Sequence, residues 1–277
     1  MPELPQMQAL AERLTEAFGG AELRDAIPLQ FAALKTVRPG PEVLRGRTLT
    51  GVGRRGKFLV LRFGGPRALV HLSQGGRVIV EPSAKATRPK QGVVRFVFPG
   101  RPGWLVREFG TERKAGWWVL AAGDDGPLAR LGPEPSSDEF RDLLLGAQDR
   151  RHLHTFLRDQ RTVAGIGRGY ADDVLHRARL SPYATLASLD ATARRALFGT
   201  VAQVLDEALA KERTRSGGLP PKLSDHFTVH GHAGEPCPAC GEDLRRISFE
   251  SREVTYCPSC QTGGTILADR RMSRLIK

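Results

Sequence analysis

The sequence predicts an α+β protein, and three observations carry that prediction. A helical apolar spacing occupies residues 3–18, short β-rich runs separated by glycine fill residues 30–122, and helical patterns return over residues 136–213. Four cysteines then gather in pairs near the end of the chain. We expect three parts: an N-terminal helix with a β-sandwich at 1–130, a helical domain at 131–222 and a cysteine-bearing hairpin with a basic tail at 223–277.

The first element is a single amphipathic helix. Its apolar side chains follow one another in steps of three or four residues, at Leu4, Met7, Ala11, Leu14 and Phe18. This spacing places them on one face of a helix. The segment lacks the basic start and apolar centre of a secretory signal, so we expect it to belong to the folded protein.

Short β-rich runs follow the helix, each bounded by glycine or proline. The runs lie at 48–52, 58–63, 69–72, 93–98 and 104–106. Pro99-Gly100 between the last two is a hairpin signal. The pattern predicts a β-sandwich or a barrel joined to the leading helix.

The next part is helical and begins after a proline-rich hinge at 131–135. Ser136 and Glu139 have the spacing of a capping box that opens a helix. The clearest helix covers 190–213, with Leu197 and Val201 on its apolar face, and the glycines that follow end it.

The cysteines predict a metal site. Cys237 and Cys240 form one C-x2-C pair, Cys257 and Cys260 form the other, and the spacing between the pairs is that of a zinc ribbon. Two disulfides are the alternative, but without an export signal we expect a reducing compartment. Four thiolates leave no open position on the ion, so one structural Zn²⁺ in a C-terminal zinc-finger hairpin is expected.

The composition limits the class of protein. In 277 residues, 42 Lys and Arg stand against 30 Asp and Glu, which gives a net charge of +12. Hydrophobic residues make up 40%, so the chain can build a core and is not disordered. No apolar run reaches the ~18 residues of a membrane span. The basic balance indicates a polyanionic partner, usually nucleic acid, with a merely solubilising surface as the alternative.

The second residue is the first candidate for chemistry. Removal of Met1 would expose the secondary amine of Pro2. Such an amine attacks a sugar C1′ to give an iminium, an electron sink that makes the C2′ proton acidic. Glu3 could act as general acid on the opening sugar ring. Many proteins begin with Met-Pro, so this start indicates a catalytic site only together with other functional groups. Lys57 and the glycine-rich turn at 165–170 are such groups, because both could bind phosphate.

An ordered set of motifs resembles the formamidopyrimidine-DNA glycosylase and endonuclease VIII family of bifunctional base-excision enzymes. The motifs span nearly the whole chain: 1–5 (MPELP), 54–57 (RRGK), 71–77 (HLSQGGR), 107–110 (REFG), 131–135 (LGPEP), 165–173 (GIGRGYADD) and 234–237 (GEPC). The resemblance implies a helix and β-sandwich, a helix-two-turn-helix domain and a zinc-finger hairpin. It also implies damaged double-stranded DNA as the partner of a monomer in the bacterial cytoplasm, associated with the nucleoid.

The resemblance assigns the catalytic groups residue by residue. Pro2 would be the nucleophile that forms the Schiff base, and Glu3 would be the acid on the deoxyribose. Lys57, the catalytic lysine carried by its strand, and His71, a DNA-binding residue, would hold the phosphates that flank the flipped nucleotide. An enzyme that acts at C1′ must flip the base out of the stack, which is the reason for these contacts.

The other carried-over residues bind DNA. Gln74, Arg107 and Phe109 would fill the gap left by the extruded base, with packing at the rim of the sandwich as the alternative for Gln74 and Phe109. Arg168 would donate to a phosphate from the helix-two-turn-helix turn. Arg252 in the zinc-finger hairpin would grip the phosphates around the lesion.

Several positions depart from the family pattern. Gln6 stands in place of a glutamate close to the nucleophile, so base release could be impaired. Gln74 replaces a methionine and is closer to endonuclease VIII. Arg168 and Gly169 replace an asparagine and an aliphatic residue. Only residues 219–228 precede the zinc-finger region, which is short for a loop that caps 8-oxoguanine.

These departures order the functional hypotheses. The first is a DNA glycosylase with AP-lyase activity, which removes oxidised bases, pyrimidines favoured, and cleaves the strand by β- and δ-elimination. The second is an AP lyase without base excision. The third is a non-catalytic binder of damaged DNA, and the fourth is an RNA- or ribosome-associated zinc-ribbon protein that rests on charge and cysteines alone.

Overall fold

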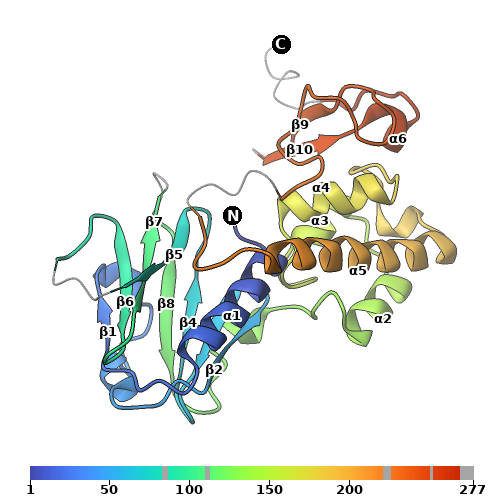
Figure 1. Cartoon of the computed structure of the whole chain (residues 1–277). Coiled ribbons are helices and arrows are strands. Elements are labelled where there is room, and N and C mark those ends of the chain that lie inside the picture. The colour runs from blue at the N-terminus through green and yellow to red at the C-terminus, as the bar shows by residue number, and fades with distance from the viewer. Residues whose placement is uncertain (83–86, 110–112, 221–225, 250–251, 269–277) are drawn as a thin grey trace, which may run out of the picture. The chain divides into compact units, whose positions relative to one another are not determined.

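A computed structural model describes residues 1–82, 87–109, 113–220, 226–249 and 252–268 of the chain. The chain forms two compact units, and most of their helices and strands are labelled in Figure 1. The first comprises Met1–Arg130 and the returning segment Leu209–Leu223, and the second comprises Leu131–Ala208 and Ser224–Lys277.

The first unit contains two antiparallel sheets of four strands each. One sheet has the order β1-β6-β7-β5, from β1 (Asp25–Pro28), β6 (Gly92–Val97), β7 (Gly103–Glu108) and β5 (Gly76–Glu81). The other has the order β2-β3-β4-β8, from β2 (Gly51–Arg55), β3 (Phe58–Arg62), β4 (Arg67–His71) and β8 (Gly116–Leu120). Short 3-10 turns lie at Phe31–Ala33, Pro41–Leu44 and Gly126–Arg130.

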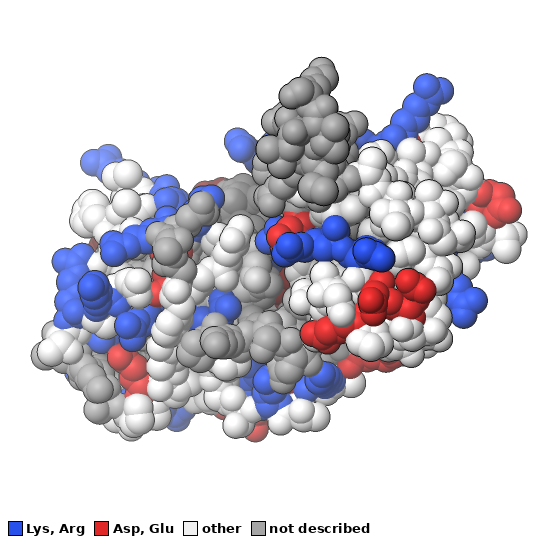
Figure 2. Space-filling model, turned by 90° about the horizontal axis from the view of Figure 1, so that it is seen from above, with Lys and Arg blue, Asp and Glu red and all other residues white. Residues whose placement is uncertain are grey.

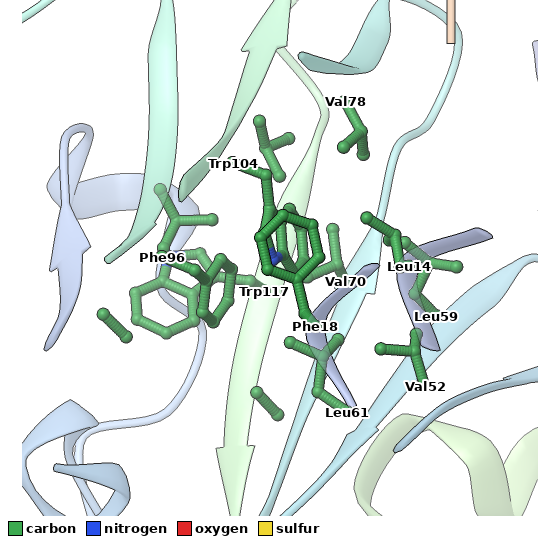
Figure 3. Packing of buried hydrophobic residues seen from close by; sticks show 14 of the residues in the cluster. Leu14, Phe18, Val52, Leu59, Leu61, Val70, Val78, Phe96, Trp104 and Trp117 are labelled. Carbon is green, nitrogen blue, oxygen red and sulfur yellow. The ribbon is translucent and has the colours of Figure 1, made fainter. Parts of the chain in front are cut away.

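The core of this unit lies between the sheets and under the leading helix. Trp104 stacks on Phe96 with ring centroids 4.2 Å apart, and Trp117 meets Phe96 edge-on at 6.1 Å. Figure 3 shows these rings beside Leu14 and Phe18, which come from the helix. Burial of such rings contributes much of the stabilisation of a domain. The predicted β-sandwich with a leading helix is therefore confirmed.

Helix α1 (Leu4–Phe18) is tied to the edge strand β2. The hydroxyl of Thr15 donates to the Val52 carbonyl and accepts the Val52 N–H, both at 2.8 Å. Nearer the start of the helix, Arg54 Nε donates to Gln8 Oε1 at 3.2 Å. Helix and strand thus run in opposite directions, and the beginning of α1 lies toward the turn between β2 and β3.

The second unit is helical and ends in a β-hairpin. Its elements are α2 (Asp138–Gly146), α3 (Leu153–Arg158), α4 (Arg168–Arg177), the 3-10 turn Leu186–Ser188, most of α5 (Ala191–Arg213), β9 (Arg245–Phe249), β10 (Arg252–Tyr256) and α6 (Pro258–Thr262). The last turn of α5, from Leu209, belongs to the first unit. Strands β9 and β10 pair antiparallel, so the expected helical part and C-terminal hairpin are both present.

Two adjacent buried carboxylates join α4 to the hairpin region. Asp173 accepts the backbone N–H groups of residues 228, 229 and 230 at 2.8, 2.9 and 3.2 Å. Asp172 accepts the N–H of Thr255 at 3.0 Å and lies 3.2 Å from His154 and 2.6 Å from His230. Burial opposes the charge of Asp172, but its two histidines outweigh burial and hold its pKa below the usual value.

Element boundaries show where local patterns were sufficient. The helices expected at 3–18 and 190–213 are found at Leu4–Phe18 and Ala191–Arg213. The cap of α2 is Ser137, whose hydroxyl accepts the Phe140 N–H at 3.2 Å, so the capping box at Ser136 and Glu139 was wrong by one residue. Among the described residues, the helices include none with the length and apolarity needed to span a bilayer.

Candidate functional site

The N-terminal segment is held in a fixed conformation by its own side chains. Pro2 is buried, and Glu3 is 3% exposed and forms the N-cap of α1. The Glu3 N–H donates to Gln6 Oε1 at 3.0 Å, and the Glu3 carboxylate accepts the backbone N–H of Gln6. This reciprocal capping box places the two candidate catalytic residues at the beginning of the helix.

The turn between β2 and β3 brings a lysine and a histidine together. Gly56 takes the left-handed conformation with φ +54° that a two-residue hairpin requires, and Lys57 follows it at 5% exposure. Phe58 pairs with His71 across β3 and β4, with rings 4.7 Å apart. Burial and the charge of Lys57 lower the pKa of His71 to about 4. His71 is therefore neutral at physiological pH.

This low pKa predicts a pH effect on folding. Unfolded histidine binds a proton near pH 6.5, whereas folded His71 does so near 4. We expect stability to fall as pH drops between these values, by up to about 3 kcal/mol. His71→Gln should remove that loss, which denaturant unfolding of both proteins at pH 7.5, 6 and 5 would measure. Parallel pH curves for the two proteins would show that His71 does not titrate in this way.

The proposed void-filling residues meet at one end of the first sheet. The N–H of Phe109 donates to the Gly75 carbonyl at 2.9 Å, which sets Phe109 beside the turn that carries exposed Gln74. The Arg107 guanidinium lies 5.1 Å from the centre of the Phe109 ring, which is 40% exposed. Beneath them, buried Glu108 accepts two backbone N–H groups at 2.8 and 2.7 Å. The Phe109 ring is exposed, while the backbone next to it is held by hydrogen bonds. Such a ring is suited to contact a nucleobase.

The candidate residues of the first unit therefore gather at one end of the sandwich. The beginning of α1 lies toward the Gly56–Lys57 turn, His71 adjoins that turn, and Gln74 follows His71 by three residues. Figure 2 shows Lys and Arg side chains at several separate places on the visible face, among many uncharged residues and some Asp and Glu. Neutral and cationic donors around buried Pro2 suit a phosphodiester substrate.

The glycine-rich turn before α4 is held by a glutamine that the sequence reasoning missed. Gln160 donates to the Ile166 carbonyl at 2.6 Å and accepts the Gly165 N–H at 2.9 Å. Gly165 has φ +103°, a conformation that favours glycine. Arg168 follows as the first residue of α4 and is half-buried. The turn thus presents Arg168 at a helix N-terminus.

The structure explains why glycine follows Arg168. A Cβ at Gly169 would lie 2.1 Å from the ring of Phe227, so no larger residue fits without movement. Phe227 packs edge-on against Tyr170 with centroids 5.0 Å apart and contacts His230 at 5.0 Å. The aromatic ring fills the space that an aliphatic side chain at 169 would take.

The four cysteines of the second unit converge as predicted. The sulfur atoms of Cys237, Cys240, Cys257 and Cys260 all lie within 4.8 Å of one another. Four sulfurs bound at 2.3 Å to a tetrahedral ion lie about 3.8 Å apart, so the cluster fits zinc. His176 Nε2 lies 3.1 Å from Cys237 Sγ and can donate to that thiolate, as ligand-supporting groups do.

Arg252 begins β10, but its side chain lies outside the described residues. Arg168, Arg252 and the cysteines belong to the second unit, and the other candidate residues belong to the first. Besides Gln160, the sequence reasoning missed the carboxylate of Glu212, which lies 3.3 Å from Gln6 across 206 residues of chain. No local pattern around position 212 indicates that contact.

Sequence models of three known domains match the chain. The formamidopyrimidine-DNA glycosylase N-terminal domain matches residues 1–118, and the formamidopyrimidine-DNA glycosylase H2TH domain matches 131–217. The zinc finger found in FPG and IleRS matches 234–263 and contains all four cysteines. With the sulfur cluster, this match identifies a structural zinc site and confirms the zinc prediction.

Individual proteins similar to this chain agree with the domain matches. A formamidopyrimidine-DNA glycosylase of Thermus thermophilus is 34% identical over 281 residues, covering 95% of this chain and 100% of that protein. An uncharacterized formamidopyrimidine-DNA glycosylase-like protein of Mycobacterium tuberculosis is 41% identical over 160 residues, or 56% of this chain and 99% of that protein. A Lactococcus lactis protein in complex with DNA containing Fapy-dG has a TM-score of 0.81 at 24% identity, over 94% of this chain and 100% of that chain, and shows the same fold.

Proposed function

The chain belongs to the formamidopyrimidine-DNA glycosylase family, and on that premise we propose that it is a bifunctional DNA glycosylase and AP lyase of base-excision repair. The observation that carries the proposal is the buried Pro2–Glu3 start of a chain that matches a glycosylase over its whole length. Its substrate would be damaged double-stranded DNA, bound by a monomer. The residue roles below are part of the proposal.

The chemistry follows from a secondary amine at the N-terminus. The nitrogen of Pro2 bonds to C1′ as the bond from C1′ to the base breaks, and the departing base takes up the proton that the nitrogen loses. The ring oxygen then leaves C1′ and takes a proton from Glu3, so that an iminium remains between C1′ and nitrogen. The iminium makes the C2′ proton acidic: a base, such as water, takes this proton, the electrons of the C–H bond form a double bond between C2′ and C3′, and the 3′ phosphate leaves by β-elimination. A second elimination releases the 5′ phosphate.

The other residues of the first unit would hold the substrate for these steps. Lys57 and neutral His71 would bind the phosphates on either side of the flipped nucleotide, the first by charge and the second by a hydrogen bond. Gln74, Arg107 and Phe109 would occupy the space left in the duplex, since a gap in the stack costs a few kcal/mol. Arg168 and Arg252 would clamp the backbone from the second unit.

We propose oxidised pyrimidines as the favoured lesions. Two features support this preference over 8-oxoguanine: a polar Gln74 in the exposed turn, and the short segment 219–228. The test is base release and borohydride trapping on duplexes carrying thymine glycol, 8-oxoguanine, a formamidopyrimidine or an abasic site, with undamaged duplex as control. We expect thymine glycol to react at least about 10-fold faster than 8-oxoguanine, a difference of about 1.4 kcal/mol.

The same panel separates the alternative activity. An AP lyase without base excision is favoured by Gln6, because an amide stands where the family has a carboxylate. Such a protein would form an adduct with the abasic duplex alone and leave all three damaged bases attached. Tight binding with no adduct on any duplex would identify a non-catalytic binder instead.

A further inference from the structure

A buried carboxylate from the distant end of α5 lies against the N-terminal segment. Glu212 is 0% exposed, and its Oε1 accepts a hydrogen bond from Gln6 Nε2 at 3.3 Å. Its other oxygen lies 3.2 Å from Arg215 Nε. A buried carboxylate is costly unless polar groups and a cation lie against it, and here the amide of Gln6 and the guanidinium of Arg215 do so.

The segment that carries Glu212 is fastened to α1. Arg13 donates from Nη1 to the Glu212 carbonyl at 3.1 Å and from Nε to the Gly217 carbonyl at 2.8 Å. On the exposed side, Arg213 and Glu12 form two hydrogen bonds of 2.8 Å. These contacts hold the backbone at 212 in place, so the position of its carboxylate is set by α1 itself.

Glu212 determines which way the amide of Gln6 points. Because a carboxylate only accepts, the amide nitrogen of Gln6 must face Glu212, and the amide oxygen is left to accept the Glu3 N–H at 3.0 Å. If the amide were reversed, two acceptors would meet at 212 and a donor would face the N–H of Glu3. The hydrogen-bond chain from 212 through 6 therefore ends on the residue bonded to Pro2.

We propose that Glu212 is a positioning residue of the N-terminal site: through Gln6, it holds Glu3 and the adjoining Pro2 amine in their reactive arrangement. The proposal deepens the proposed function and rests on it. For this role, one of the side chains at positions 6 and 212 must donate a hydrogen bond to the other. The side chain at position 6 must also keep an oxygen that accepts the Glu3 N–H. Displacement of reacting groups by about 1 Å can cost roughly 100-fold in rate, so a broken pair should slow the chemistry.

Exchanging side chains between the two positions tests the pair. Glu212→Ala removes the acceptor, and Gln6→Glu sets two carboxylates against each other. Glu212→Gln keeps an acceptor for Gln6, and the double variant Gln6→Glu with Glu212→Gln restores a pair in which the donor has moved to 212. Glu207→Gln, on the same helix with 51% side-chain exposure, is the control.

The measurement is the single-turnover rate of borohydride trapping on a saturating abasic duplex, with DNA affinity and thermal unfolding recorded for each protein. We expect Glu212→Ala and Gln6→Glu to slow trapping by about 10- to 100-fold at saturating DNA, without loss of DNA affinity. Glu212→Gln, the double variant and the control should stay within about threefold of the wild type. A merely structural role would lower the unfolding temperature and leave the rate of the folded protein unchanged.

The outcomes separate the two levels of the proposal. No adduct with the wild-type protein would overturn the proposed function and this inference with it. If the wild type, Glu212→Ala and Gln6→Glu all form the adduct at the same rate, the role of Glu212 is overturned but the proposed function is not. If Glu212→Ala does not fold, Gln6→Glu is compared with the double variant instead. A double variant that traps as slowly as Gln6→Glu would contradict the pairing of positions 6 and 212.

Discussion

A protein whose N-terminal proline nitrogen is blocked should form no borohydride-trapped adduct and leave an abasic duplex intact. An uncleaved N-terminal extension converts the nitrogen of Pro2 into an amide, which has no lone pair to attack C1′. Pro2→Gly leaves a primary amine, whose imine must first be protonated to act as an electron sink. We expect strand cleavage to fall at least about 1,000-fold in both proteins, as for loss of other catalytic nucleophiles.

The matched control is Pro5→Ala, which alters a buried proline of the same helical turn and leaves the terminal amine unchanged. It should trap at nearly the wild-type rate. DNA affinity of the blocked protein should remain, because its phosphate contacts come from other residues. Mass spectrometry of the starting protein must show that Met1 is absent, and mapping of the adduct should place it on residue 2. An adduct formed by the blocked protein would assign the nucleophile to another amine, such as that of Lys57.

Loss of one zinc ligand should unfold the C-terminal hairpin and weaken DNA binding. Cys257 is fully buried in the sulfur cluster, and Cys257→Ser replaces a thiolate with a much weaker ligand. Structural zinc contributes about 10–16 kcal/mol of apparent folding free energy in isolated fingers, so the small hairpin cannot keep its fold without it. We expect DNA affinity to fall at least about 10-fold, since phosphate contacts carry most of the affinity.

Hydrogen exchange and metal content would follow this change directly. Amides of β9 and β10 should lose protection in Cys257→Ser, whereas amides of α1 and the sandwich should keep theirs. Ser259→Ala, an exposed position between two cysteines, is the control and should keep its zinc. Trapping at saturating DNA should change little, because the chemistry at Pro2 does not use the metal. Undiminished DNA affinity in the unfolded-hairpin variant would show that Arg252 does not grip the phosphates.

The strands that sequence reasoning missed show the limit of local patterns. Strand β1 has only four residues, β5 begins with Gly76-Arg77 inside a glycine-rich turn, and β8 (Gly116–Leu120) lies in none of the β-rich runs predicted from the sequence. All three are edge strands, and each has a partner that lies far away in the chain or follows a long connection. These segments are strands because they pair with those distant partners. The alternation of apolar and polar side chains within each segment does not indicate a strand by itself.

Position 6 shows the same limit within the site. From the sequence alone, Gln6 lacks the carboxylate that the family has at this position, so Gln6→Glu would be expected to help base release. Beside Glu212 that change sets two buried carboxylates together, and we expect it to slow the reaction. Gly169 likewise departs from the family pattern, and the sequence gives no reason for it. The reason is the ring of Phe227, which occupies the space beside Gly169. In both cases the deciding residue comes from a different part of the chain.

The sequence by itself determined the features that depend on nearby residues: the face of α1, the length of α5, the cysteine pairs and the proline next to Met1. Helical periodicity, ligand spacing and N-terminal processing act over a few positions, so they can be recognised without a fold. Only the tertiary structure decided which groups lie side by side. It set His71 beside Lys57, Phe109 beside Gln74, and Glu212 beside Gln6. Desolvation and hydrogen bonding at these contacts depend on distance in space, which position along the chain does not specify.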